Sequence, residues 1–399
     1  MCGFRSRYST QHAILNLLSK WQTCLDKSGV VGTILMDLSK AFDCLPHDLI
    51  LAKLHAYGVD ANSLKLLQSY LSNRHQRIKL ESTFSSWLQI LIGVPQGSIL
   101  GPLLFNIFLN DILFLNLNSK ICNFADDNTI YSCASSTNEV IQNLQDDLKV
   151  VLSWFKENQM MANPGKFQFM LLGKHHPSQI NIEDKILQPS NSVKLLGLTI
   201  DKNLKFDEHC ESICKTANAK IKCLRRLRSS LNIDQAKLLY NSFIFPQFNY
   251  CSIIWMFCSK KANAAIDKIQ KRALRIVYNE PHMSLQQLIE KDKGMSIHTK
   301  NIITLLTEIY KTDKGENPSF MSDVFIKKDV NYSLRTSNLL TLPSTKTVRY
   351  GLNTFSFRAS ILWNSLPDVF KKSSSSKIFK KSLKENWRGL KCTCHICKT

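Results

Sequence analysis

Apolar and polar positions alternate differently in the two halves of the chain. Up to about residue 200, short apolar and β-branched runs alternate with amphipathic segments, whereas long basic amphipathic segments follow residue 201. Near the start, Leu17, Leu18, Trp21 and Leu25 share one face of a helix expected at residues 11–27. The pattern predicts a mixed α/β region followed by a mostly helical one.

Continuous apolar runs predict the strands of the first region. Residues 30–36 (VVGTILM) are typical of a strand buried on both faces, and the run ends at Asp37. Two shorter runs, residues 121–125 and 128–133, are separated only by a pair of aspartates, which is the spacing of a hairpin. Further strands are expected within residues 75–91, 167–172 and 193–200.

Helical periodicity covers much of the remaining sequence. Helices are expected at residues 46–57, 61–72, 102–115, 138–158, 207–230, 234–244 and 261–278. Pro46 and Pro102 suit the first turn of the helices that they open. Residues 371–381 form a Lys/Ser run, which is typical of a solvated surface or a linker.

The charge is distributed as unevenly as the pattern. The 399 residues carry a net charge of +21, with 17 basic and 15 acidic side chains in residues 1–200 but 35 and 16 in residues 201–399. This excess of positive charge indicates a polyanionic partner, and nucleic acid is favoured over an acidic membrane surface. Thirteen cysteines, an odd number scattered in apolar runs, favour reduced thiols in an intracellular protein. Residues 99–117 and 238–258 approach membrane length, but their polar residues favour buried core over a membrane span.

Three carboxylates follow or interrupt the buried runs. Asp37 ends one strand, and Asp126 and Asp127 lie at the tip of the expected hairpin. Adjacent aspartates are often plain turn formers, but buried flanks and a third aspartate favour a cluster. Close carboxylates raise one another's pKa unless a cation neutralises them, and hard oxygen ligands suit Mg²⁺. Two such ions can activate an attacking hydroxyl and stabilise a leaving pyrophosphate.

Six segments, in order along the chain, carry a resemblance to a known family. From the start of the chain they are GFR at residues 3–5 with Ser9 and Thr10, DLSKAFD at 37–43, GVPQGS at 93–98 with LGP at 100–102, FADD at 124–127, NPGK at 163–166, and LGLTID at 196–201. In this order and spacing they resemble the motifs of reverse transcriptases of non-LTR retrotransposons, the jockey-like RNA-directed DNA polymerases. The fold that this implies is a right-hand polymerase of the α/β (α+β palm) class, with an antiparallel-sheet palm.

The resemblance also implies a domain layout. Residues 1–202 would form partial fingers and the palm, residues 203–300 a helical basic thumb, and residues 301–399 a C-terminal region with the Lys/Ser run and a Cys-rich tail. The upstream fingers motifs and an endonuclease domain are missing from the match, so the chain is expected to be N-terminally truncated. Arg5 and Arg7 are the basic residues nearest the start.

By the same resemblance, Asp37, Asp126 and Asp127 would bind two Mg²⁺ ions. Phe42 would be the steric gate against a 2′-hydroxyl, although it could be an ordinary core aromatic. Gln96 and Gly97 would shape the nucleotide pocket, with Gly97 allowing close backbone approach, although the segment could be a plain strand-to-helix turn. Other positions are less specific: Lys166 could protonate the pyrophosphate leaving group or lie in a simple turn.

The expected helix at 261–278 has a cationic face. Its members are spaced at i, i+3, i+4 and i+7, and they are Lys268, Lys271, Arg272 and Arg275. Apolar residues line another face, so one face packs and the other is suited to a phosphate backbone, although it could be only a solvated face. Cys210, Cys214 and Cys223 have helical spacing and are expected to be core thiols.

The Cys-rich tail is a weak metal candidate. Cys392, Cys394, His395 and Cys397 stand within six residues, which is too close to complete a tetrahedral zinc site easily. Zinc at the tail is therefore not expected.

The function implied by these features is RNA-templated extension of a DNA 3′-end from deoxynucleoside triphosphates by a two-Mg²⁺ nucleotidyl transfer. Its partners would be an RNA template and a DNA primer, with no membrane, and a nuclear location is expected by resemblance. The alternative is a non-catalytic nucleic-acid-binding remnant of such a polymerase.

Overall fold

The computed structural model describes residues 2–182, 185–328, 338–386 and 394. The chain forms two compact units. Unit 1 comprises Met1–Tyr8 and Gly29–Ser190, and unit 2 comprises Ser9–Ser28 and Asn191–Thr399. The units therefore change over at residue 190, and the expected functional boundary at residue 202 stays a prediction.

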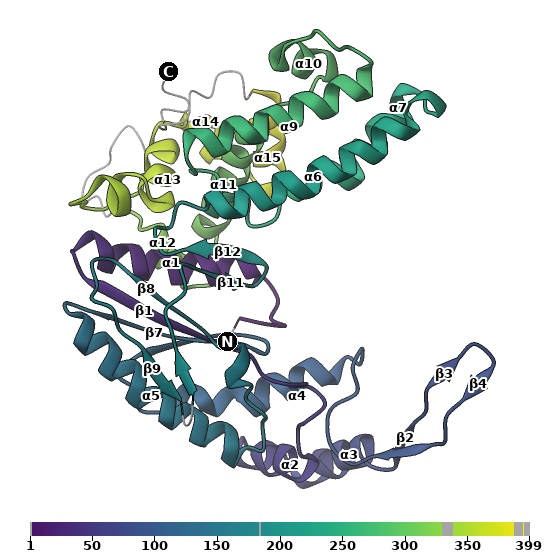
Figure 1. Ribbon diagram of the computed structural model, residues 1–399, viewed down its shortest axis with the longest axis vertical. Helices are drawn as coiled ribbons and strands as arrows, with labels where there is room; N and C mark the ends of the chain where they lie inside the picture. The colour runs from purple at the N-terminus through teal and green to yellow at the C-terminus, as the bar shows by residue number, and fades with distance from the viewer. Residues whose placement is uncertain (1, 183–184, 329–337, 387–393, 395–399) are drawn as a thin grey trace. The chain divides into compact units, whose positions relative to one another are not determined.

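A four-stranded antiparallel sheet forms the centre of unit 1 (Figure 1). Its strands, in spatial order, are β6 (Lys120–Phe124), β7 (Asp127–Ala134), β1 (Val30–Met36) and β8 (Gln168–Leu172). Every residue of β1 is buried, as its continuous apolar run predicts. The strand that ends at Asp37 is thus a central strand of the α/β fold that the sequence predicts.

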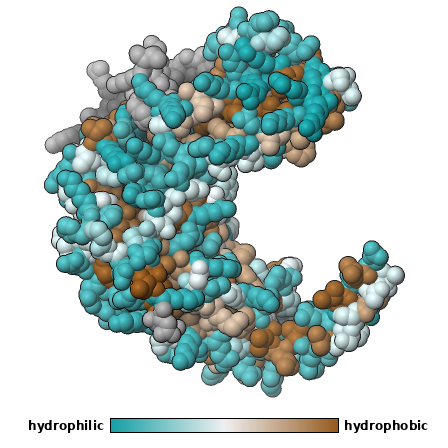
Figure 2. Space-filling model, in the orientation of Figure 1, coloured by the Kyte–Doolittle hydropathy of each residue, from teal (hydrophilic) through white to brown (hydrophobic). Residues whose placement is uncertain are grey.

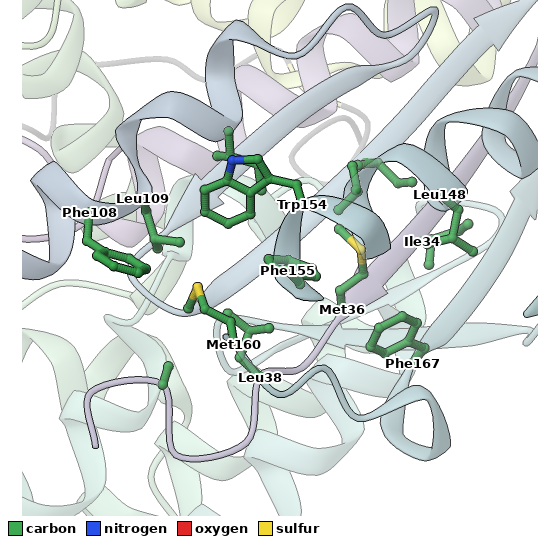
Figure 3. Close-up of a cluster of buried hydrophobic side chains, with 14 of the residues drawn as sticks. Ile34, Met36, Leu38, Phe108, Leu109, Leu148, Trp154, Phe155, Met160 and Phe167 are labelled. Atoms are coloured by element: carbon green, nitrogen blue, oxygen red, sulfur yellow. The ribbon is translucent and has the colours of Figure 1, made fainter. Parts of the chain in front are cut away.

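Helices pack on this sheet through one hydrophobic core. The helix α5 (Thr137–Glu157) contacts β1 and β7, and α4 (Leu100–Leu109) contributes to the same core. A Cβ atom at Gly32 would lie 2.5 Å from Cγ1 of Val140, so the missing side chain lets α5 approach the sheet closely. Figure 3 shows the tightly filled part of this core, including Ile34, Met36, Leu109, Leu148, Trp154 and Phe155.

A long β arm leaves the body of unit 1 after two helices (Figure 1). The helices are α2 (His47–Ala56) and α3 (Ala61–Leu71), and the arm contains β2 (Arg74–Gln76), β3 (Lys79–Leu80), β4 (Thr83–Phe84) and β5 (Leu88–Ile90). The arm pairs β2 with β5 and β3 with β4, as expected for residues 75–91. Its side chains are largely exposed, and apolar residues are visible on it in Figure 2.

The aspartate hairpin differs by one residue from the sequence prediction. Asp126 and Asp127 were expected to separate the strands, but Asp127 is the first residue of β7 and pairs with Phe124. The two turn residues are Ala125 and Asp126. Ala125 has a φ of +53°, a left-handed conformation that alanine rarely adopts and that no apolar pattern reveals. Asp127 is therefore held by the sheet itself.

Short strands and turns complete unit 1. They are η1 (Asn110–Phe114), η2 (Pro164–Lys166), β9 (Ile180–Ile182) and β10 (Lys185–Leu187). The apolar helix expected at 102–115 is α4 followed by the 3₁₀ turn η1.

Unit 2 is mostly helical, as the pattern beyond residue 201 predicts. It contains α1 (Thr10–Asp26), β11 (Ser192–Leu195), β12 (Leu198–Asp201), α6 (Asp207–Leu227), η3 (Arg228–Ser230), α7 (Ile233–Leu239), η4 (Tyr240–Ile244), η5 (Phe245–Phe248), α8 (Ser252–Trp255), α9 (Lys260–Tyr278), α10 (Leu285–Asp292), α11 (Ile297–Asp313), α12 (Met321–Val324), η6 (Val348–Leu352), α13 (Phe355–Asn364), α14 (Asp368–Lys371) and α15 (Ser376–Glu385). The helices α6 and α9 pack side by side.

The C-terminal helices correct one sequence prediction. Residues 371–381 are not a linker, because they end α14 and form most of α15, which packs on α11. The alternative prediction, a solvated surface, fits their lysines Lys372, Lys377, Lys380 and Lys381, which are exposed. Phe379 and Leu383 are fully buried, because apolar residues spaced by four turn one face of α15 into the core. Cys210 and Cys214 are buried thiols as predicted, whereas Cys223 is exposed.

The apolar stretch at residues 238–258 does not form one continuous helix. It is divided among α7, a π-helical turn, a 3₁₀ turn and α8. Within the described ranges, no helix combines the length and the apolar character needed to cross a bilayer.

Asp147 offers a test of how the sheet is held. Its buried carboxylate accepts hydrogen bonds from the backbone N–H groups of Asn118 and Ser119, just before β6 begins, at 3.0 and 2.5 Å. Asp147→Ala leaves two backbone donors without this acceptor, so we expect the free energy of unfolding to fall by about 1–3 kcal/mol in urea titrations. The neighbouring Asp146→Ala, on the solvent side, should change it by less than about 0.5 kcal/mol. Equal small effects from both variants would contradict this role.

Candidate active site

The register of the central strands brings two of the predicted aspartates together. Met36, the last residue of β1, pairs with Asn128, so continuing the same register by one residue would set Asp37 opposite Asp127. Residues directly opposite in an antiparallel pair project on the same face of the sheet. The backbone of Asp37 is held on its other side by Asn163, whose N–H donates to the Asp37 carbonyl at 3.1 Å.

Two buried asparagines support the hairpin that carries the other carboxylates. Asn128 donates from Nδ2 to the backbone carbonyl of Asp126 at 2.8 Å. Asn123 in turn donates its amide to the side chain of Asn128. Both residues are 1% exposed, so a fully buried pair of amides holds the turn. The sequence prediction missed them, although an asparagine inside each apolar run was an available signal.

The N-terminal segment passes directly over the same turn. The N–H of Cys2 donates to the carbonyl of Asn123 at 2.9 Å, and Asn106 donates to the carbonyl of Gly3 at 2.9 Å. A Cβ atom at Gly3 would lie 2.4 Å from the backbone nitrogen of Ala125. Only glycine fits there, which gives a physical reason for the first residue of the predicted fingers segment.

The electrostatics of Asp127 show the effect of its two acidic neighbours. Burial raises the pKa of Asp127, and the nearby charges of Asp126 and Asp37 raise it further. Lys166 lies against the cluster, with Nζ 3.2 Å from Oδ2 of Asp37. Both of these side chains are well exposed, so the ion pair is open to competition by another cation.

Whether these residues suit a metal ion can be tested on their chemistry. Across the residues that the structure describes, no three His, Cys, Asp or Glu side chains are arranged to hold an ion. The donor set nevertheless fits a hard divalent cation, because it consists of carboxylates whose mutual repulsion a cation would relieve. Lys166 supplies part of that counter-charge to Asp37.

Phe42 lies between two other aromatic rings. It stacks on the fully buried Phe105 with ring centroids 4.1 Å apart, and Phe4 meets it edge-on at 5.7 Å. Phe42 itself is only half-buried. Its ring is therefore held in place by the core without belonging entirely to it.

The turn at residues 93–97 follows the arm and precedes α4. Gly93 and Gly97 have φ angles of +88° and +83°, which favour glycine at both positions. A Cβ atom at Gly97 would meet no protein atom within 4 Å. The backbone of Gly97 therefore faces open space, and the conformation, not close approach of another part of the chain, explains this glycine. Gln96 is exposed and donates from Nε2 to Oδ1 of Asp43 at 2.8 Å.

The predicted cationic face lies in a groove of unit 2. The groove has a volume of about 680 Å³, and its basic lining comes from α6, η3 and α9: Arg225, Arg228, Lys268, Lys271, Arg272 and Arg275. Two of these guanidinium groups hold the backbone, because Arg275 donates to the Met283 carbonyl and Arg228 donates to the carbonyls of Ile276 and Leu231. The sequence identified the cations of α9 but not these structural roles.

The Cys-rich tail can be compared with its prediction only in part. Cys394 is buried, and its Sγ lies 3.5 Å from Nε2 of His298. Cys392, His395 and Cys397 lie outside the described residues.

Comparisons with known proteins place the chain in a family. Residues 1–200 match the family described as reverse transcriptase (RNA-dependent DNA polymerase). The probable RNA-directed DNA polymerase from transposon BS of Drosophila melanogaster is 26% identical over 318 residues, 74% of this chain and 34% of that protein. The RNA-directed DNA polymerase from mobile element jockey of Drosophila funebris is 25% identical over 303 residues, which cover 73% of this chain and 33% of that protein.

A solved structure, apo telomerase from Candida tropicalis, is 14% identical, with a TM-score of 0.39 over 76% of this chain and 51% of that one. The chain spans about a third of the length of the curated relatives that it matches. The matched half of the chain contains the sheet, the aspartate hairpin and the 93–97 turn. Its curated relatives are polymerases of non-LTR retrotransposons. The chain therefore belongs to the reverse transcriptase (RNA-dependent DNA polymerase) family.

Proposed function

We propose that this chain carries the polymerase site of an RNA-directed DNA polymerase, which extends a DNA 3′-end on an RNA template. The single observation that supports this most is the strand register, which aligns Asp37 with Asp127 beside Asp126. Family membership makes deoxynucleoside triphosphates the expected substrates. Unit 1 would supply the catalytic groups and unit 2 a surface for nucleic acid.

Asp37, Asp126 and Asp127 would hold Mg²⁺. When bound there, the ions supply the positive charge that lowers the pKa of an attacking 3′-hydroxyl and stabilises the leaving pyrophosphate. Asp127 is the carboxylate most in need of such a partner, because its pKa is raised by burial and by the other two carboxylates. Lys166 would leave Asp37 as the ions bind and could then donate a proton to the pyrophosphate.

Phe42 and the 93–97 turn would shape the nucleotide pocket. Since Phe105 fixes the ring of Phe42, that ring can exclude a 2′-hydroxyl by simple overlap. The open space at Gly97 leaves room for a substrate to approach the backbone. Gln96 adds a polar side chain at the same turn.

The groove between α6 and α9 would bind the phosphates of the template–primer duplex. Among its cations, Lys268 and Lys271 would contact phosphate, while Arg228 and Arg275 hold the backbone of the groove. Arg272 donates to the side chain of Asn218 at 2.9 Å and would add its charge from there. Lysine and arginine side chains that neutralise phosphates release counterions, which makes such binding strongly salt-dependent.

The competing candidate is a protein that binds nucleic acid but has no polymerase activity. Two observations favour it: the three carboxylates do not converge on a common ion site, and Lys166 pairs with Asp37. The two candidates differ in whether the chain extends a primer and in whether that extension depends on the aspartates.

Primer extension on an RNA template tests this difference. Asp126→Asn should lower the extension rate at least ~100-fold, because it removes one of the negative charges that would hold the Mg²⁺ ions. Its melting temperature should not fall, since the change also removes a like charge beside Asp127. Asp146→Asn, also in unit 1, serves as the control and should extend normally. A wild-type chain that binds the duplex with no extension would support the non-catalytic candidate.

Binding of an RNA–DNA duplex, measured as a function of salt, tests the groove. The double variant Lys268→Ala/Lys271→Ala should bind about 10-fold more weakly and reduce the slope of log Kd against log salt concentration by roughly 2. The matched control, Lys260→Ala/Lys261→Ala, removes the same charge from the same helix outside the groove lining. Equal losses in the two double variants would mean that net charge alone, and not the groove, governs binding.

A further inference from the structure

The turn at residues 93–97 is fastened to the segment that follows β1. The N–H of Val94 donates to the Phe42 carbonyl at 2.9 Å, and the N–H of Gly93 donates to the Leu45 carbonyl at 2.7 Å. A Cβ atom at Gly93 would lie 2.7–2.9 Å from backbone atoms of Asp43. The two segments are therefore in direct backbone contact, and the absence of a side chain at Gly93 permits it.

His47 adds a side-chain bond to this contact. Its Nε2 lies 2.8 Å from the carbonyl oxygen of Gly93. A carbonyl oxygen can only accept, so Nε2 carries the hydrogen and donates it. Both backbone polar groups of Gly93 are thereby bonded to the segment that contains Phe42. His47 is the first residue of α2, which fixes the position of its ring relative to the turn.

Asp43 determines which end of the Gln96 amide faces outward. An ionised carboxylate accepts hydrogen bonds and donates none, so Oδ1 of Asp43 selects the NH₂ end of the amide. The carbonyl end of the amide, Oε1, is then directed away from Asp43. Oε1 is an acceptor and can bind a hydroxyl donor, whereas it would repel the oxygens of a triphosphate.

We propose that Asp43 and His47 are positioning residues, which lock the 93–97 turn onto the Phe42 segment and present the acceptor end of Gln96 to a sugar hydroxyl of the incoming nucleotide. This inference rests on the proposed function. The ring of Phe42, which would exclude a 2′-hydroxyl, and the amide of Gln96, which would accept from a sugar hydroxyl, are then both held by the contact between residues 42–47 and the 93–97 turn. In this proposal Asp43 and His47 act through their hydrogen bonds to Gln96 and Gly93.

Steady-state extension with the Asp43→Asn variant tests the inference. Asparagine can donate as well as accept, so the Gln96 amide is free to turn over. We expect KM for the deoxynucleotide to rise about 10-fold with kcat within 2-fold. The preference for deoxynucleotides over 2′,3′-dideoxynucleotides should also fall. Asp48→Asn, an exposed acid five residues on, is the control and should leave both quantities unchanged.

A reciprocal exchange separates positioning from a general structural role. In Asp43→Asn/Gln96→Glu, the asparagine NH₂ donates to one glutamate oxygen, and the other oxygen remains an acceptor facing outward. We expect KM to recover to within about 3-fold of the wild-type value. For His47, the variant His47→Gln keeps an N–H donor for Gly93 and should extend better than His47→Ala.

The orientation of Gln96 can also be measured without turnover. In nitrogen-15 spectra of the full chain, the side-chain NH₂ resonances of Gln96 should shift in Asp43→Asn and stay unchanged in Asp48→Asn. A wild-type chain without extension activity would overturn the proposed function, while this shift would still test the Asp43–Gln96 contact. Unaltered Gln96 resonances, an unaltered KM, or a double variant worse than Asp43→Asn would overturn the positioning role.

Discussion

The pairing of β1 with β7 is the constraint on which the rest of the site depends. Seven consecutive residue pairs fix the register from Val30 to Met36, so the chain enters Asp37 next to the start of β7, where Asp127 lies. A shift by one residue would turn every side chain of β1 to the other face and put Val31 or Thr33 at the place of Gly32, where a Cβ atom would lie 2.5 Å from Cγ1 of Val140. The fold thus keeps like charges together, and the pKa of Asp127 is raised first by burial and then by the nearby charges of Asp126 and Asp37.

The two turns near the carboxylates, at residues 125–126 and 93–97, are each held by hydrogen bonds from neighbouring residues or segments. Asn123 and Asn128 hold the hairpin turn from within the sheet. The segment at residues 42–47 holds the 93–97 turn. The proposed polymerase site would need this rigidity, because positioning contributes to rate only when the reacting groups are already in place. Lys166 and Gln96, by contrast, are exposed side chains that can exchange partners.

How far the sequence could predict this structure depends on what each element needs. The apolar run at Val30–Met36 marked β1 to the residue, because a strand buried on both faces leaves a continuous signal. The hairpin turn was misplaced by one residue, since the left-handed backbone of Ala125 has no compositional mark. The many lysines and serines of residues 371–381 predict a solvated surface or a linker, and this composition hides the single buried Phe379.

The site was predictable in kind but not in its connections. Motif spacing identified the three aspartates, Phe42 and the 93–97 turn, whose roles remain predictions. Spacing could not reveal that Lys166 pairs with Asp37, or that Arg228 and Arg275 donate to carbonyl groups within unit 2. Such contacts depend on the folded backbone and not on motif spacing, and those between Lys166 and Asp37 and between Arg228 and Ile276 join residues distant in sequence.

The central claim is that Asp37 and the hairpin aspartates act as one cation site. Binding of Mn²⁺, detected by electron paramagnetic resonance, measures this directly and needs no substrate or turnover. If the claim holds, Asp37→Asn and Asp126→Asn will each weaken Mn²⁺ binding at least ~10-fold, although the two residues lie on separate segments. Wild-type affinity in Asp37→Asn would mean that this carboxylate and the hairpin do not share an ion, and the account would be wrong.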